Sequence, residues 1–115
     1  MPGQTDLLSE EQIKNYHATL SIALRRLNEH YMGKMMSIPI AGIANANRLY
    51  RILNFDIVPV EKGGSKMTNT TNLENILKSK NITDLVIMAR YKDNRGNEGL
   101  VEINSFLAAN DIKKL

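Results

Sequence analysis

Apolar residues recur at intervals of three and four positions between residues 10 and 32, which is the periodicity of a helix with one buried face. The apolar stripe comprises Ile13, Tyr16, Leu20, Ala23, Leu24, Leu27 and Tyr31, opposite Lys14, Arg25, Arg26 and Glu29. Ser9 and Gln12 form a capping box, which marks a helix start. The pattern predicts a long N-terminal helix that packs on a core.

The same stripe also permits self-association of the first helix. Part of it fits the a and d positions of a heptad: Ile13, Tyr16, Leu20, Ala23 and Leu27. Three heptads with poor d positions make a marginal coiled coil. A core-packing helix is the favoured interpretation, and a homodimer through this helix is the alternative.

Residues 40–53 show a similar helical spacing. Ile43, Ala46, Leu49, Tyr50 and Leu53 fall on one side, and Asn45, Arg48 and Arg51 on the other, with Ile52 among them. Pro39 suits the first turn of a helix because a first-turn residue needs no N–H donor. The spacing predicts a second, basic helix.

The second half of the chain predicts short strands and helices. The expected elements are a strand at 55–60 with Pro59 favouring a sheet edge, a loop at 61–71, a helix at 72–80, a buried strand at 85–91, a turn at 92–99, a returning strand at 100–103 and a terminal helix capped by Asn104 or Ser105. The predicted fold is α+β and a single domain over residues 1–115. A long N-terminal helix and a second basic helix pack on a small antiparallel sheet with a C-terminal β-hairpin and a short terminal helix.

Composition narrows the class of protein. The chain has 115 residues, 43% hydrophobic and 23% charged, which is enough for one globular core. The absence of Cys excludes disulfides and thiolate metal sites.

No apolar run approaches the roughly 18 residues of a membrane span, and the N-terminus is not a secretory signal. We expect a cytoplasmic or nuclear protein that is not secreted and does not bind membranes. Its high Asn and Ile content indicates an AT-rich genome, such as that of a virus.

Positive charge is concentrated in the middle of the chain. The net charge is +3, and residues 34–54 carry Lys34, Arg48 and Arg51 without any acidic residue. A local basic field of this kind recruits nucleic acid, another polyanion or an acidic partner surface.

The basic segment predicts a nucleic-acid contact. Asn45, Arg48 and Arg51 would form one polar ridge of the second helix, with Lys34 beside it. Arg and Asn side chains hydrogen-bond phosphates and base edges. Lys92 and Arg95 on the hairpin would add phosphate contacts. The alternative is a solvated face whose arginines pair with acids elsewhere.

Part of this segment resembles a known DNA-binding element. Residues 42–54, GIANANRLYRILN, resemble the recognition helix of TetR-type helix-turn-helix repressors. The distance from Gly42 to Leu49 is one residue longer than in that motif, so the family is not assigned.

Two other binding functions are alternatives. A protein-binding adaptor or inhibitor would use the first helix or the Met-rich turn, through Met32, Met35 and Met36, because exposed Met adapts to partner surfaces. A nucleotide or phosphate binder would use Gly63, Gly64 and Lys66. These residues lack the spacing of a P-loop, so a connector with Thr70 or Thr71 capping the next helix is favoured.

No motif indicates catalysis. His17 and His30 lie on one predicted helix at an angle of roughly 220° to each other, so one chain cannot bring both to one metal. The chain has no GxSxG and no HExxH motif. We expect a non-enzymatic, regulatory protein without a metal or cofactor.

Overall fold

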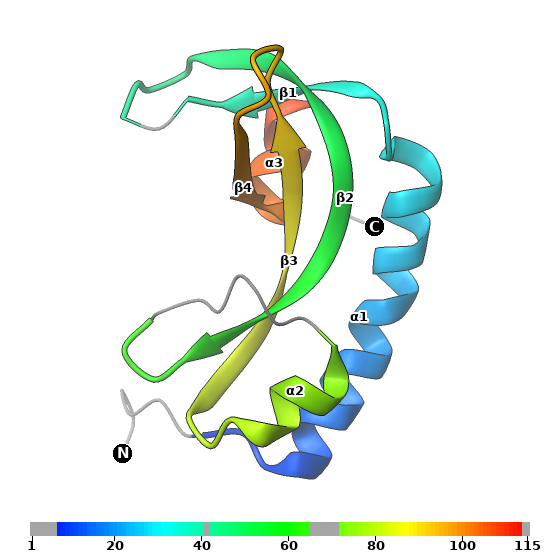
Figure 1. The fold of residues 1–115 in the computed structure, drawn as a ribbon, viewed down its shortest axis with the longest axis vertical. Helices are drawn as coiled ribbons and strands as arrows, with labels where there is room; N and C mark the ends of the chain where they lie inside the picture. Colours follow the sequence, from blue (N-terminus) through cyan, green and yellow to red (C-terminus); the bar gives the residue numbers. More distant parts are fainter. Residues whose placement is uncertain (1–6, 41, 65–71, 114–115) are drawn as a thin grey trace. The chain divides into compact units, whose positions relative to one another are not determined.

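The computed structural model describes residues 7–40, 42–64 and 72–113, which form three helices and four strands (Figure 1). In chain order these elements are α1 (Glu10–Tyr31), β1 (Met35–Pro39), β2 (Asn47–Glu61), α2 (Leu73–Lys78), β3 (Ile82–Lys92), β4 (Glu98–Glu102) and α3 (Ile103–Ala109). The strands form one antiparallel sheet in the order β1-β2-β3-β4. The predicted α+β class, the long first helix, the C-terminal hairpin and the short terminal helix are confirmed. No helix in the described ranges is long and apolar enough to cross a membrane.

The chain divides into two compact units. Unit 1 comprises residues 1–22 and 57–86, and unit 2 comprises residues 23–56 and 87–115. Because α1, β2 and β3 contribute residues to both units, each unit is described by its own segments.

Unit 1 has an aliphatic core. Its buried side chains are Ile13, Ile57, Val58, Pro59, Ile76, Ile82 and Leu85. The predicted capping box opens α1: the Ser9 N–H donates to Gln12 Oε1 at 2.8 Å, and the Gln12 N–H donates to Ser9 Oγ at 3.1 Å. These reciprocal bonds satisfy donors that a helix start leaves unpaired.

The start of α2 differs from the prediction. Asn72 is the N-cap, and its Oδ1 accepts a hydrogen bond from the Asn75 N–H at 2.9 Å. The predicted caps, Thr70 and Thr71, lie outside the described residues. Asn is as good an N-cap as Thr or better, so the short helix has the cap it needs.

Unit 2 has an aromatic core. The rings of Tyr31, Phe55 and Phe106 meet edge to face, with centroids 5.3–6.4 Å apart. Leu27 and Ile52 are buried in the same unit. Such ring pairs add to the stabilisation that burial alone provides.

Two asparagine side chains occupy sheet-edge positions in unit 2. Asn28 Oδ1 accepts from the Phe55 N–H at 2.8 Å, and its Nδ2 donates to the Phe55 carbonyl at 3.4 Å. Asn110, just after α3, bonds the Ser37 N–H and carbonyl in the same way, both at 2.8 Å. Each side-chain amide therefore replaces one residue of a pairing strand, which satisfies backbone groups at the strand edge.

The predicted second helix at 40–53 is wrong. Residues 47–53 belong to β2, and Met35–Pro39 pair with Asn47–Arg51 in an antiparallel register. Gly42 and Asn45 in the preceding loop have φ of +82° and +59°, a left-handed conformation that interrupts a right-handed helix. The resemblance to a recognition helix is therefore not supported, because those residues form a strand.

β2 changes its pleat between Ile52 and Phe55. The Ile52 N–H donates to the Lys34 carbonyl at 2.8 Å, on the β1 edge of the strand. Phe55, three residues later, presents its backbone groups to Asn28, since β3 occupies the other edge. Groups on one edge are normally an even number of residues apart, so one extra residue is inserted, as in a β-bulge.

Other boundaries shift by a few residues. The hairpin turn covers residues 93–97 rather than 92–99, because Lys92 still pairs with Glu98. The terminal helix begins at Ile103 after Glu102, with no side-chain cap from Asn104 or Ser105. Pro59 lies in β2, which is an inner strand, yet beyond the stretch that pairs with β1.

Candidate functional site

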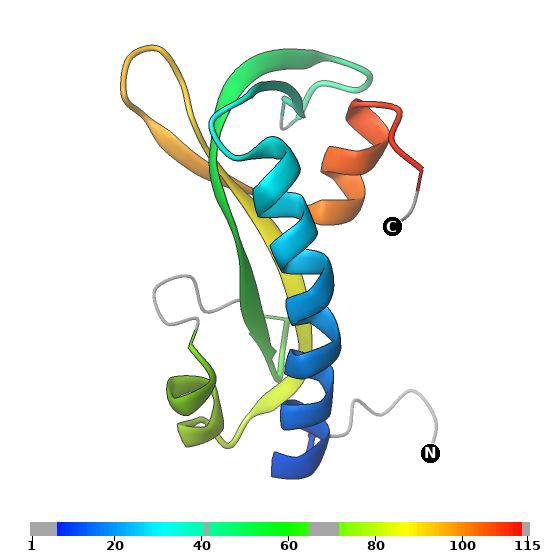
Figure 2. The ribbon, with the colours of Figure 1, turned by 90° about the vertical axis from the view of Figure 1, so that its right-hand side faces the viewer.

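A groove in unit 2 lies between the start of β2 and the turn of the β3–β4 hairpin. Figure 2 shows the hairpin turn bending away from the start of β2. The groove has a volume of about 610 Å³ and is lined by Met35, Arg48, Leu49, Tyr50, Asp93, Asn94, Arg95 and Asn97. It combines cationic, amide, aromatic and aliphatic side chains.

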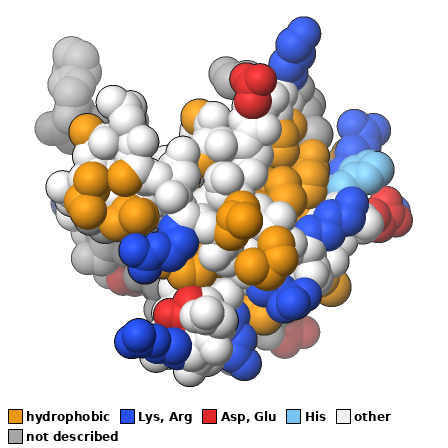
Figure 3. Space-filling view, turned by 90° about the horizontal axis from the view of Figure 1, so that it is seen from above, with side chains coloured by type: hydrophobic (Ala, Val, Ile, Leu, Met, Phe, Trp, Pro, Cys, Tyr) orange, Lys and Arg blue, Asp and Glu red, His pale blue; other side chains and the backbone are white. Residues whose placement is uncertain are grey.

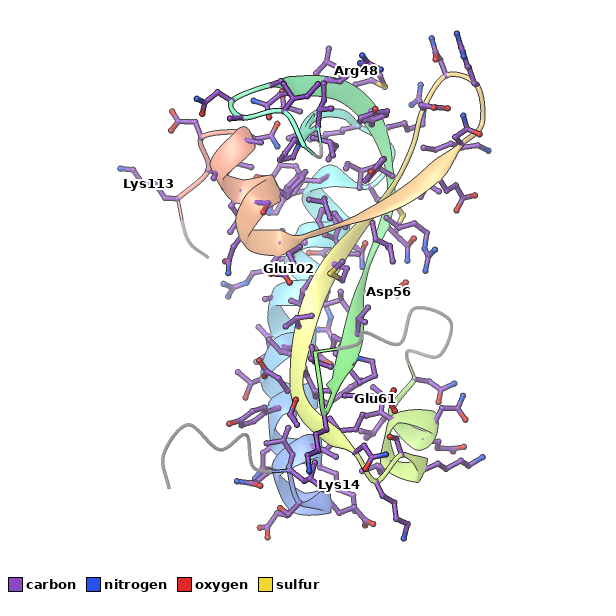
Figure 4. The ribbon with its side chains drawn as sticks, turned by 90° about the vertical axis from the view of Figure 1, so that its left-hand side faces the viewer. Lys14, Arg48, Asp56, Glu61, Glu102 and Lys113 are labelled. Carbon is purple, nitrogen blue, oxygen red and sulfur yellow. The ribbon has the colours of Figure 1, made fainter. Side chains whose placement is uncertain are left out.

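Arg48 and Arg95 supply the positive charge of the groove. Arg48 is exposed at the start of β2 (Figure 4), and Arg95 is exposed at the hairpin turn. The two residues are far apart in the sequence, and the antiparallel pairing of neighbouring strands brings their ends together. Both belong to the predicted nucleic-acid contacts, so the structure groups part of that set.

Among the described residues that line the groove, the acidic one is Asp93. Its carboxylate accepts hydrogen bonds from the backbone N–H of Asn97 at 2.8 Å and of Arg95 at 2.9 Å. The Asn97 Nδ2 also donates to it at 3.2 Å. These bonds, led by the Asn97 N–H, lower the pKa of Asp93. The carboxylate thereby organises the turn that carries Arg95.

Tyr50 is the aromatic residue of the groove. Its ring lies against Tyr91, with centroids 4.8 Å apart and planes tilted by 36°. The Tyr91 ring crosses the backbone of Gly99, where an added Cβ would come within 2.5 Å of ring atoms. Burial, and secondarily Tyr50, raise the pKa of Tyr91. Because Gly99 has no side chain, the Tyr91 ring can lie over its backbone and pack against Tyr50.

Exposed aliphatic side chains border the same groove. Leu49 is 61% exposed and Met35 is 50% exposed. The register places both on one face of the β1–β2 pair. Figure 3 shows hydrophobic side chains beside Lys and Arg side chains across this end of unit 2. Exposed apolar groups that lie together make this surface a candidate for binding.

The remaining predicted cations lie outside the groove. Arg51 Nη1 donates to the Gly33 carbonyl at 2.8 Å, which ties it to the turn after α1. The Nζ of Lys34 lies 5.9 Å from the centroid of the Tyr31 ring, a cation–π contact. Lys92 lies opposite Glu98 on the hairpin. The Arg51 and Lys34 side chains therefore have structural contacts within the unit, and Lys92 is exposed on the hairpin.

Asn45 and Arg90 also lie apart from the groove. Asn45 lines a smaller hollow of about 330 Å³ with residues of α3. Arg90 Nη2 lies 3.6 Å from Asp56 Oδ2 on the neighbouring strand. The predicted ridge of Asn45, Arg48 and Arg51 therefore does not form, since it required a helix.

The predicted Met-rich surface is divided. Met32 is 52% exposed and Met35 lines the groove. Met36 points to the opposite face of β1, where it lies across from Tyr50 and is half-buried. The structure therefore leaves Met32 and Met35 accessible to a partner.

The predicted phosphate loop lies in unit 1. Gly63 and Gly64 have φ of +95° and +90°, and the Gly64 N–H donates to the Glu61 carbonyl at 2.9 Å. The Lys62 N–H donates to the Asn81 carbonyl at 2.7 Å, so two of the loop amides already have partners. Lys66 lies outside the described residues, and phosphate binding here stays a prediction.

The histidines form no site with other ligands. Among the described residues, no group of three or more His, Cys, Asp or Glu is placed to hold a metal ion. His17 contacts Ser21, whose Oγ donates to the His17 carbonyl at 2.7 Å, an ordinary bond within a helix. Comparisons of the chain with protein-family models, curated proteins and solved structures found no match.

Sequence reasoning missed Leu49, Tyr50, Asn94 and Asn97 as groove residues. It also assigned Leu49 to the buried side of a helix, although the side chain is exposed. The signal that could have found them is the β-branched and aromatic content of residues 48–58, which is typical of a strand.

Proposed function

We propose that this chain is a non-enzymatic protein that binds nucleic acid through the groove of unit 2. The observation that carries the proposal is that Arg48 and Arg95 line one groove from two different segments of the chain. Guanidinium groups bind phosphates through paired, charge-assisted hydrogen bonds, so two of them can follow a phosphate backbone.

The charge balance of the units supports the same surface. Unit 2 contains ten Lys and Arg against six Asp and Glu, a net charge of +4, whereas unit 1 contains five against six, a net charge of −1. The Asp93 carboxylate in the groove already accepts three hydrogen bonds from its own turn. A phosphate would therefore approach a predominantly positive region.

The recognition element differs from a recognition helix. Its cations come from a strand and a hairpin turn, and β-structures also serve as nucleic-acid-binding elements. Asn94 and Asn97 on the turn add amide groups that suit polar contacts to sugars or bases.

The test is fluorescence anisotropy of labelled nucleic acid at two salt concentrations. We expect Arg48→Ala with Arg95→Ala to weaken binding and to reduce the magnitude of the log–log salt slope by roughly 1.4 for a single strand or 1.8 for duplex DNA, since each phosphate contact contributes about 0.7 or 0.9.

The matched control is Arg25→Ala with Arg26→Ala. These arginines are exposed in unit 2, do not line the groove and change the net charge equally. Equal loss of binding in both double variants would mean that overall charge, not the groove, binds nucleic acid. No binding by the unmodified chain at low salt would refute the proposal.

Protein binding is the second candidate function. The exposure of Leu49, Met32 and Met35 in one unit favours it, because exposed Met and Leu are typical of adaptable protein interfaces. Replacing Met35 and Leu49 with Ser should then lower the affinity of the chain for a purified protein partner. Ile22→Ser, at a residue of unit 1 that is 60% exposed, should leave that partner's affinity unchanged.

A further inference from the structure

The groove contains apolar side chains and the face of an aromatic ring, which make no favourable polar contact with a phosphate backbone. Leu49 is 61% exposed, Met35 is 50% exposed, and Tyr50 lines the same groove. The outside of a duplex presents phosphates and sugars, while its base faces are hidden in the stack. Apolar and aromatic groups gain from contact with base faces that a single strand leaves open.

We propose that the groove binds an unpaired stretch of nucleic acid, in which a base stacks on Tyr50 while Arg48 and Arg95 bind the flanking phosphates. This inference rests on the proposed function and specifies its ligand. The alternation of aromatic and cationic groups matches the alternation of bases and phosphates along a strand.

The support behind Tyr50 fits this role. Tyr91 lies against the Tyr50 ring at a centroid distance of 4.8 Å, and Tyr91 occupies space that only a glycine at position 99 leaves open. A ring that is held in place loses little conformational entropy when a base stacks on it. Tyr91 and Gly99 are therefore positioning residues for the groove.

The site is short. Tyr50 and Tyr91 are the aromatic residues that the structure describes at this groove, and Tyr50 is the one that lines it. The low aromatic content of the chain, 5%, also argues against an extended row of stacked rings. The groove therefore suits very few bases.

The experiment compares three labelled ligands of equal length: a single strand, a single strand whose sugars lack bases, and a duplex. The abasic strand keeps the phosphates, so it separates base contacts from charge. We expect the intact single strand to bind most tightly. Tyr50→Ala should weaken that binding roughly 5- to 150-fold and leave the abasic strand unaffected.

Further variants separate stacking from folding. Tyr50→Phe should retain the preference for bases, whereas Tyr50→Leu should lose it while keeping an apolar side chain of similar burial. Gly99→Ala should weaken binding of the intact strand by displacing Tyr91. Thermal unfolding of each variant identifies any loss that comes from unfolding.

The outcomes distinguish this inference from the proposed function. Equal affinity for intact and abasic strands, or tighter binding of the duplex, would overturn the inference and leave phosphate binding in place. Failure of all three ligands to bind would overturn both. A preference for bases that Tyr50→Leu abolishes and Tyr50→Phe preserves would establish the stacking role.

Discussion

The two units differ in core chemistry and in charge. Unit 1 buries aliphatic side chains and carries a net charge of −1, whereas unit 2 also buries Phe55 and Phe106, which meet the half-buried ring of Tyr31, and carries +4. Five of the six Phe and Tyr residues lie in unit 2; Tyr16 is the exception. The groove and its arginines belong to the same unit.

Within unit 2, residues of the same chemical type occupy both the core and the groove. In unit 2, Phe55 and Phe106 are buried while Tyr50 lines the groove, so aromatic side chains serve both the core and the surface. In unit 1 the described hollow beside α2 is lined by Leu and Ile side chains with Glu10, Ser79 and Lys80, and its lining includes no aromatic residue. The contrast predicts that substitutions of buried side chains in unit 2 lower stability, whereas substitutions of side chains that line the groove lower binding.

The largest expected effect is the loss of an aromatic core residue. Phe106 is fully buried and contacts two other rings at centroid distances of 5.3 and 5.6 Å. Phe106→Ala removes these contacts and leaves a cavity, so we expect a loss of about 3–5 kcal/mol in the free energy of unfolding. Urea denaturation followed by circular dichroism measures it.

Leu49→Ala is the matched control for this change. Leu49 is also a large apolar residue of unit 2 but is 61% exposed, so its removal should change stability by no more than about 0.5 kcal/mol. Similar losses for both variants would contradict the assignment of Phe106 to the core and Leu49 to the surface.

A smaller loss of stability is expected when asparagines with different structural roles in the two units are replaced. Asn28 in unit 2 satisfies both backbone groups of Phe55, whereas Asn72 in unit 1 caps α2 through one bond. Asn28→Ala leaves the Phe55 N–H and carbonyl without these partners, so we expect a loss of about 1–3 kcal/mol, mostly from the N–H, whose bond is the shorter. Asn72→Ala should cost only about 1 kcal/mol. Urea denaturation compares the two variants.

Hydrogen exchange of the Phe55 amide adds a local measurement. Exchange should accelerate in Asn28→Ala but less in Asn28→Asp, because an Asp keeps an oxygen that accepts from the Phe55 N–H. Equal exchange in Asn28→Ala and the unmodified chain would show that the side chain does not hold this part of β2.

The first helix and the hairpin were predictable because their signals are local. The bonds between Ser9 and Gln12 form as the capping box predicts, and the apolar run at residues 85–91 lies within β3. Ile13 and Leu27, from the predicted stripe, are buried, one in each unit, whereas Tyr16 of the same stripe is 44% exposed. Homodimerisation through α1 stays a prediction.

The groove was not predictable because it depends on β2. Ile52 and Phe55 are both buried although they are three positions apart, which is a helical interval produced by the bulge. A helix would also have left Ile52 on its polar side, whereas the strand buries it completely. Arg48 and Arg95 then meet only through the pairing of distant strands, which no local pattern encodes.

The smallest expected effect is the pH dependence of the hairpin turn that shapes one wall of the groove. Hydrogen bonds to the Asp93 carboxylate, first of all from the Asn97 N–H, lower its pKa in the folded chain. The contribution of these bonds to stability is therefore fully present above the unfolded pKa, near 4, and is lost as the pH falls through the lower folded value. In NMR titrations, the amide shifts of Arg95 and Asn97 should move with a midpoint below 4, and Asp93→Asn should abolish that transition. A midpoint at the unperturbed value would mean that the carboxylate does not organise the turn, and the position of Arg95 in the groove would then need another cause.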